Sequence, residues 1–454
     1  MHFPVSRAAV AMLLALAATG GRAASQPLPP DGPCVAPPSK AALTLPQARL
    51  DAERCNRDII AARRTEEASQ ADIQIASQRP NPVLSVGVAN INQTYGIGAG
   101  NLRSKTVDST FRVDQVIETA NKGNLRVDAA RKSNAAAGEQ LQAIVAQQVG
   151  AVDQAWYEAV VSQERVEVLT DMVGLYGRTQ QANEARLKAG DVSRSDVTKL
   201  QLDTLRAQND LRAAQADHAR DKAALAATIG VPGTLADNRL IPDWPSLDTP
   251  VPPVDPDTLQ RRPDVTAAEA RLAAAAASRD VARAGRVPDV TVGAQYEHYP
   301  ISQTNTTGSG NSWGVFVSIP LFVRHSFGGE ARRAEVDYYA ALDDRNRILL
   351  EAQNDIERLR AQLESARLSL KQMRESVLPA AESVANSAEF AYSKGASGVL
   401  DLLDSRRALR QTRLDAVEAQ GDYAKALAAY RTALQATNTD INKLPQVRTD
   451  APRQ

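Results

Sequence analysis

Apolar positions recur along this chain in two rhythms, one helical and one strand-like. Helical spacing covers residues 43–77 and resumes from about residue 126, where an unbroken helix would run for about 95 Å. Between these runs apolar and polar residues alternate over residues 83–92 and 108–117, which predicts two short strands. The long helical run stops at Gly190 and then restarts, so we expect a hairpin of two antiparallel helices with its tip near residue 190.

The same plan is written twice. Gly190 and Gly395 are 205 positions apart, and so are Asp196 and Asp401. Strand-like alternation returns over residues 289–299 and 312–321, ahead of a second hairpin with its tip near residue 395. The predicted parts of the chain are a signal peptide (1–23), an extended segment (24–42), a first repeat (43–229), a Pro-rich linker (230–258), a second repeat (259–434) and a C-terminal tail (435–454).

The four predicted strands have the length and alternation of outer-membrane strands, apolar outside and polar inside. Four strands cannot close a barrel, and lipid does not tolerate unpaired strand edges, so copies from several chains would share one barrel. Two chains would supply eight strands and three chains twelve. The alternative is an ordinary soluble hairpin packed on a helix, because short alternating runs are common. The polar residues expected to face the lumen are Arg112, Asp114, Thr291, Gln295 and Glu297.

Composition narrows the class of protein. Only 4% of residues are aromatic, which suits long alanine-rich helices, and 53 basic residues balance 53 acidic ones, which argues against nucleic acid as a partner. Residues 1–23 have the basic start, apolar run and small-residue cleavage site of an export signal. No later segment is apolar enough for a transmembrane helix.

The chain has two cysteines, Cys34 and Cys55, and in an oxidising compartment these two could form a disulfide. A lipid anchor on Cys34 is the weaker alternative, because PLPPDGP before it lacks the apolar run of a lipoprotein signal. No enzyme, metal site or cofactor is predicted. GIGAG at Gly96 lacks the following lysine of a phosphate loop, and the four histidines have no metal-ligand spacing.

Several phrases in this doubled order resemble the TolC family of outer-membrane efflux channels, over about Leu43 to Leu434. They are RRPDV at Arg261, QVIETANKGNLR at Gln115, VSIPLF at Val317, AATIGVPG at Ala226 and YAKALAAYRTAL at Tyr423. The second phrase is similar to the branch that serves heavy-metal efflux pumps.

The resemblance implies an α+β membrane protein that works as a homotrimer. Its long helical coiled-coil hairpins would form a periplasmic α-barrel, and four transmembrane strands per chain would complete a shared twelve-stranded barrel in outer-membrane lipid. The implied partners are a periplasmic adaptor and an inner-membrane pump of the RND type. The implied function is the exit duct through which small solutes, metal cations or drugs leave the cell. Two alternatives stay open: a periplasmic adaptor, or an extracytoplasmic coiled-coil scaffold without a pore.

By the same resemblance, Tyr392, Asp401 and Asp404 would hold a helical iris shut and line it with acid. Asp401 and Asp404 are three residues apart on one helix face, so three chains would place six carboxylates around an axis and favour cations. The alternative is that Ser397 and Asp401 serve as helix N-terminal residues.

The resemblance also assigns four residues to the hairpin tips that an adaptor would grip: Gly190, Ser193, Asp196 and Gly395. The family has an apolar residue before each tip glycine. Ala189 keeps this pattern loosely, and Lys394 departs from it.

Overall fold

We analysed a computed structural model of the chain. The structure describes residue 34 and residues 41–91, 106–231, 233, 235–248, 250–251, 253–254, 256–301 and 308–434. The predicted signal peptide, nearly all of the extended segment, the C-terminal tail and most of both strand-connecting loops lie outside these residues. Every element below belongs to one compact unit, Ala36–Gln454. No helix in the described part of the chain has both the length and the apolar character to cross a membrane.

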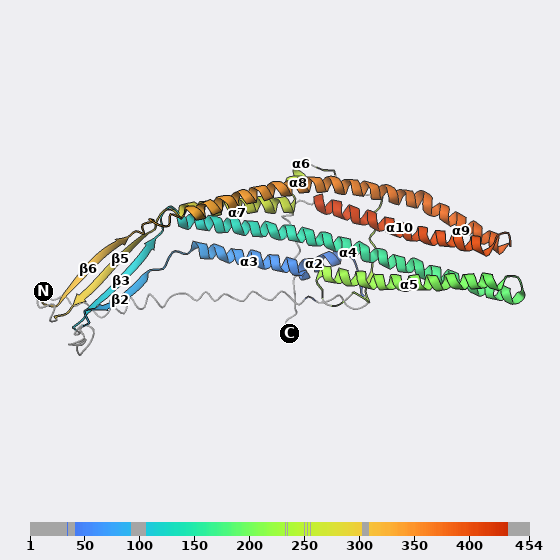
Figure 1. The fold of residues 1–454 in the computed structure, drawn as a ribbon, viewed down its shortest axis with the longest axis horizontal. Helices are drawn as coiled ribbons and strands as arrows, with labels where there is room; N and C mark the ends of the chain where they lie inside the picture. The colour runs from blue at the N-terminus through green and yellow to red at the C-terminus, as the bar shows by residue number, and fades with distance from the viewer. Residues whose placement is uncertain are drawn as a thin grey trace, which may run out of the picture. The chain divides into compact units, whose positions relative to one another are not determined.

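A four-stranded antiparallel sheet lies at one end of this unit, in the order β2-β3-β5-β6 (Figure 1). Its strands are β2 (Val83–Ala89), β3 (Asp108–Ile117), β5 (Val290–Tyr299) and β6 (Gly310–Ser318). Four bounds differ from the prediction: β5 begins one residue late, β6 begins two residues early, and β2 and β6 each end three residues early. β2 stops three residues early because Asn90 is in a left-handed conformation, and β6 stops at Ser318 because Pro320 cannot donate to a strand ladder.

The first repeat begins with two helices, although the apolar spacing predicts one. α2 (Leu45–Cys55) and α3 (Arg57–Ser77) are separated at Asn56, whose side chain accepts the amides of Asp58 and Ile59. The Asn56 amide also donates to the carbonyl of Thr228 at 2.8 Å. Gly230 then passes so close to Cys55 that a side chain there would overlap its carbonyl. The break between α2 and α3 therefore provides the contact site for residues 228–230, where the chain leaves the first hairpin.

The first hairpin joins α4 (Lys122–Ala189), an unbroken helix of 68 residues, to α5 (Arg194–Ile229). The second joins α8 (Gly328–Gln372) and α9 (Leu378–Ser393) to α10 (Val399–Leu434). A π-helical turn, Met373–Val377, separates α8 from α9. It ends two residues before Pro379, which lacks an N–H and whose ring would clash with a carbonyl in a regular helix.

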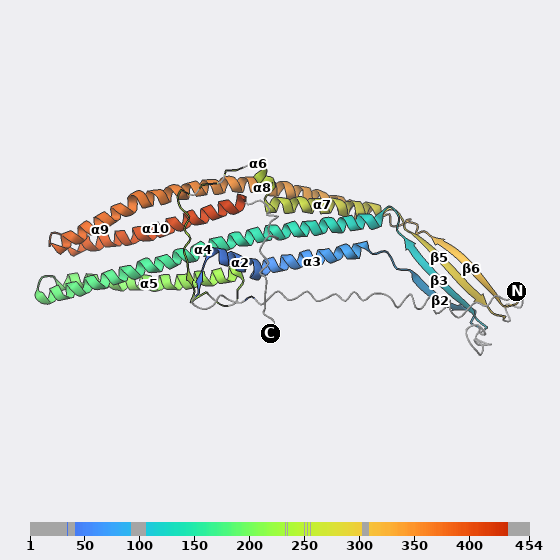
Figure 2. The ribbon, with the colours of Figure 1, turned by 180° about the vertical axis from the view of Figure 1, so that it is seen from behind.

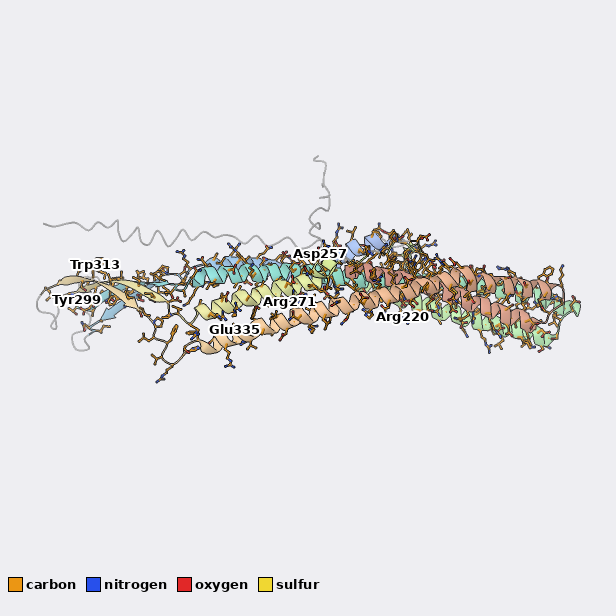
Figure 3. All side chains as sticks on the ribbon, turned by 90° about the horizontal axis from the view of Figure 1, so that it is seen from above. Arg220, Asp257, Arg271, Tyr299, Trp313 and Glu335 are labelled. Carbon is orange, nitrogen blue, oxygen red and sulfur yellow. The ribbon has the colours of Figure 1, made fainter. Side chains whose placement is uncertain are left out.

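The helices form a layer in which α3 and α5 run along α4, and α7 (Pro263–Ala284) and α10 run along α8 (Figures 1 and 2). α4 also packs against α7 and α10, so it joins the two repeats. Both hairpin tips lie at the end of the unit opposite the sheet (Figure 1). In Figure 3, Tyr299 and Trp313 mark the sheet, while Arg271 and Glu335 mark α7 and α8 nearer the middle.

The linker between the repeats is more ordered than its proline content suggests. It contains β4 (Arg239–Leu240), which pairs in parallel with β1 (Ala42–Leu43), and the short helix α6 (Pro256–Gln260). The sequence analysis predicts neither strand.

An ionic cluster fixes the sheet to the helices at the start of α4. Lys122 and the Thr119 amide both donate to Asp289, at 2.7 and 2.9 Å. Burial would raise the pKa of Asp289, but these hydrogen bonds outweigh it and hold that pKa below its usual value. Arg126 of α4 pairs with Glu118, which lies between β3 and α4.

Candidate functional site: the amphipathic sheet and the hairpin tips

The strand register places all five predicted lumen residues on one face of the sheet. Arg112 is paired with Gln295 across β3 and β5, and Asp114 is paired with Gly293. Thr291 and Glu297 lie two positions from these pairs along β5, and side chains two apart share a face. The structure therefore brings Arg112, Asp114, Thr291, Gln295 and Glu297 together.

The opposite face is apolar and exposed. Trp313 and Val315 in β6 are 80% and 79% exposed, and Leu84 and Val86 in β2 are 65% and 62% exposed. Apolar surface this continuous is costly in water. Among the described strands, β2 and β6 each have a neighbour on one side only, so the sheet also has two open edges. Lipid would cover the apolar face, and further strands at the two edges would pair with the open backbone N–H and C=O groups of β2 and β6.

At the second tip, Tyr392 on α9 reaches across to the first hairpin. Its hydroxyl donates to the side-chain oxygen of Asn183 on α4. The Arg186 guanidinium lies 5.5 Å from the centre of the Tyr392 ring. The ring also packs against an apolar cluster drawn from α4, α5 and α10: Met172, Tyr176, Leu200, Ala207, Val399 and Leu403.

Three arginines of α10 extend this contact, and the sequence analysis misses all of them. Arg406, nearly buried, donates to the Thr179 hydroxyl on α4. Arg407 donates to both carboxylate oxygens of Asp203 on α5, at 2.7 and 2.8 Å, and Arg410 pairs with Asp210 on α5 at 2.8 Å.

Asp203 is 5% exposed, and hydrogen bonding to it raises the pKa of the Arg407 guanidinium. A signal for these arginines exists in the repeat. Arg407 and Arg410 stand where the first hairpin has Leu202 and Leu205, so the second hairpin departs from the pattern there.

The two acids predicted for the iris differ in their surroundings. Asp401 is exposed in the first turn of α10 and makes no ion pair with any residue that the structure describes. Asp404 is 72% exposed, but it pairs with Arg407 at 3.0 Å. Of the two, Asp401 carries the charge without a counter-ion.

Both tips turn at glycine. Gly190 and Gly395 have φ values of +85° and +70°, in the left-handed region where other residues are strained. Ser193 caps α5 by accepting the Asp196 amide at 3.1 Å, and its hydroxyl donates to the Asp196 carboxylate at 2.8 Å. Asp196 therefore stabilises the helix start, whether or not a partner binds there.

The second tip has no such cap. Of the two residues in the alternative interpretation, Asp401 does lie in the first turn of α10, whereas Ser397 precedes Gly398, whose carbonyl accepts the first helical hydrogen bond. The Ser397 hydroxyl is buried without a hydrogen-bond partner in the described part of the chain.

Cys34 and Cys55 are both disulfide-bonded, and neither is a free thiol. The described residues contain no group of three or more His, Cys, Asp or Glu side chains placed to hold a metal ion.

Comparison with known proteins decides the family. The family model described as outer membrane efflux protein matches the chain twice, over residues 50–231 and 256–435. The chain belongs to this family. The two matched segments correspond to the two repeats, so this outer membrane efflux protein carries the family's unit in duplicate.

Individual relatives agree with this assignment. The cobalt-zinc-cadmium resistance protein CzcC of Cupriavidus metallidurans is 28% identical over 381 residues, covering 82% of this chain and 85% of that protein. Protein CyaE of Bordetella pertussis is 30% identical over 332 residues, covering 68% and 66%. The CmeC outer membrane channel of Campylobacter jejuni has the same fold, with a TM-score of 0.72 and 15% identity over 88% of each chain.

This outer membrane efflux protein is thus an exit channel, located in the outer membrane and extending into the periplasm. Its family is a family of transport channels. The alternatives of a periplasmic adaptor and of a scaffold without a pore are wrong, because the matched family is that of the outer membrane efflux proteins.

Proposed function

We propose that three copies of this chain form one duct, the outer-membrane part of a tripartite efflux pump. Each copy would contribute four strands to a twelve-stranded barrel and its helices to a tunnel across the periplasm. The observation that carries this proposal is the sheet, which has an exposed apolar face, a polar face with charged residues and two open edges. A sheet of this kind is stable in lipid only when copies complete it.

Helices from both parts of the helical layer also expose apolar residues. Four exposed apolar residues of α8 fall on one helical face: Val336, Tyr339, Leu350 and Leu368. On the other side of the layer, Ile75 of α3 and Leu202 and Leu205 of α5 are 64%, 48% and 51% exposed. Contact between unlike sides of successive copies is heterologous, and such contacts close into a ring when the rotation from one copy to the next is one third of a turn for three copies.

The exported solutes are metal cations or drugs. The relative CzcC is named for resistance to cobalt, zinc and cadmium, which favours metal cations. The unpaired carboxylate of Asp401 at the tip would favour cations as well.

We assign the gate to the second tip, with Tyr392 holding it closed and Asp401 and Asp404 lining it. The partners would be a periplasmic adaptor and an inner-membrane pump of the RND type. The adaptor would contact the tips at Gly190, Ser193, Asp196 and Gly395, which lie at the end of the unit away from the sheet (Figure 1).

The mass of the protein extracted from outer membranes in mild detergent tests this proposal. After correction for bound detergent, a particle near three times the mass of the mature chain is expected. A monomer, or recovery in the soluble periplasmic fraction, would contradict the shared barrel. A dimer would keep a shared barrel but reduce it to eight strands.

A further inference from the structure

Two glycines of the sheet lie beneath large side chains of the polar face. Gly293 in β5 is paired with Asp114 on one side and with Phe316 on the other. A Cβ on Gly293 would overlap the Asp114 carboxylate and lie 3.4 Å from Nε of Arg112. A Cβ on Gly314 would lie 2.9 Å from the Phe316 ring. Neighbouring side chains therefore already fill the space above both glycines.

Arg112 contacts Asp114 on its own strand, β3, and extends across β5 to Phe316 on β6. Its Nε donates to the two carboxylate oxygens of Asp114 at 2.9 and 2.8 Å. Its guanidinium lies 4.5 Å from the centre of the Phe316 ring, which belongs to β6. These contacts hold the three side chains along the surface of the sheet, where the Arg112 and Asp114 charges offset each other.

We infer that Gly293 and Gly314 set the free width of the barrel, by letting Asp114, Arg112 and Phe316 lie flat against its wall. The inference rests on the proposed function, because it requires the polar face to line the bore. A side chain at residue 293 would occupy the space that Asp114 and Arg112 now fill. These two side chains would then be displaced from the sheet surface and extend into the bore. Three chains would repeat this obstruction at one level, so the largest solutes would be excluded first.

The internal repeat supplies a matched control. Gly87 in β2 is the counterpart of Gly293, 206 positions earlier, and lies on the same face of the sheet. A Cβ on Gly87 would meet only the Cβ of Thr110, at 3.9 Å, which is an ordinary contact. Gly87→Ala therefore makes the same substitution on the same face without displacing a side chain.

Thiol labelling in intact cells measures the width. Ser318 and Ser312 lie on the polar face of β6, paired with Thr291 and Glu297, on either side of the Arg112 cluster. Ser318→Cys would place a thiol at the end nearer the helices, and Ser312→Cys would place one at the end farther from them. The native cysteines are disulfide-bonded and do not compete. Polyethylene glycol maleimides of graded size, all too large for general porins, are added outside and detected by gel shift.

In the parent background we expect both thiols to be labelled. Gly293→Ala should lower labelling of S318C several-fold with the largest reagents and leave S312C unchanged, while Gly87→Ala should change neither. Adding Arg112→Ala and Asp114→Ala to Gly293→Ala should restore labelling, because no long side chain is then left to displace.

Equal labelling of S318C in the Gly293→Ala and Gly87→Ala backgrounds would overturn the inference. If Gly293→Ala does not assemble, Gly314→Ala serves in its place, since it displaces the Phe316 ring alone. A parent trimer that labels at neither position would instead count against the polar face as the lining of the bore, and so against the proposed function.

Discussion

The two hairpins differ at their tips: the first has a helix cap of its own, whereas the second makes its strongest polar contacts with the first. α4 is continuous over 68 residues, and Ser193 caps α5 from within the same tip. The second hairpin is interrupted by a π-helical turn at Met373–Val377, and α10 begins at Val399 after Gly398, which has no side chain to cap it. Its strongest polar contacts at the tip, through Tyr392 and the α10 arginines, go to α4 and α5.

This difference indicates which hairpin moves. If the tips separate to open the duct, the contacts that break are those between hairpins, and the first hairpin keeps its own cap. On the proposed gating, we therefore expect the second hairpin to move, and the π-helical turn marks where its outer helix is least regular. Variants that remove contacts between hairpins should open the duct, whereas variants that remove contacts within one hairpin should not.

The largest effect is expected from Arg407→Ala. Asp203 is nearly buried, and it would lose both hydrogen bonds from Arg407, at a cost of about 1–3 kcal/mol. Since about 1.4 kcal/mol corresponds to a tenfold change in an equilibrium constant, the fraction of open tips should rise about tenfold. Resting conductance of the trimer in a planar bilayer measures this change.

Arg413→Ala is the matched control for Arg407→Ala. Arg413 also lies on α10, but its partner Glu382, at 3.1 Å, belongs to the same hairpin. Its loss should leave the resting conductance unchanged. Equal conductance in the two variants would mean that the contacts between hairpins do not hold the tip closed.

A smaller rise in conductance is expected from Tyr392→Phe. This change removes the hydroxyl that bonds Asn183 and keeps the ring, which still packs in the apolar cluster and beneath Arg186. Loss of one neutral hydrogen bond costs about 0.5–1.5 kcal/mol. The double variant with Arg407→Ala should be non-additive because both contacts hold the same interface. Simple additivity would show that the two contacts act at separate steps.

Ion selectivity should separate the two acids of the second tip. Asp401→Asn should shift the reversal potential in a salt gradient toward weaker cation preference, because this carboxylate has no counter-ion in the described structure. Asp404→Asn should shift it less, because Arg407 already offsets that charge. Asp196→Asn, the equivalent change in the first tip, is the control, since Ser193 and Lys199 hold that carboxylate. The opposite order would place Asp404 nearer the path of the ions.

Local patterns were enough to predict the sheet faces and the hairpin turns. Alternation along a strand determines which side chains share a face, so Arg112 and Asp114 were expected opposite the apolar residues. The turns at Gly190 and Gly395 followed from the interruption of helical spacing at a residue that tolerates positive φ. Pro379 is a local signal of the same kind, for the π-helical turn before it.

The contacts between elements could not be predicted in this way. The break at Asn56 depends on Thr228 and Gly230, which are about 170 residues away in the chain. Arg407 and Arg410 lie among many arginines on a polar helix face, and only the approach of α5 gives them partners in Asp203 and Asp210. The sequence shows Gly293 only as a glycine within a strand. Its role depends on the strand register, which places Asp114 and Arg112 above it.

The smallest expected effect on the duct comes from removing the helix cap at the first tip and adding one at the second. Ser193→Ala should destabilise the start of α5 by about 1 kcal/mol, because the Asp196 amide loses its acceptor. Gly398→Ser should stabilise the start of α10 by only about 0.3 kcal/mol, since glycine is already a tolerable cap and nothing lies within 4 Å of its Cβ position. Hydrogen exchange of the amides in residues 194–197 and 399–402 measures both changes. If Gly398→Ser also lowers resting conductance, the missing cap contributes to the mobility of the second hairpin; if it slows exchange and leaves conductance unchanged, the contacts between hairpins alone control opening.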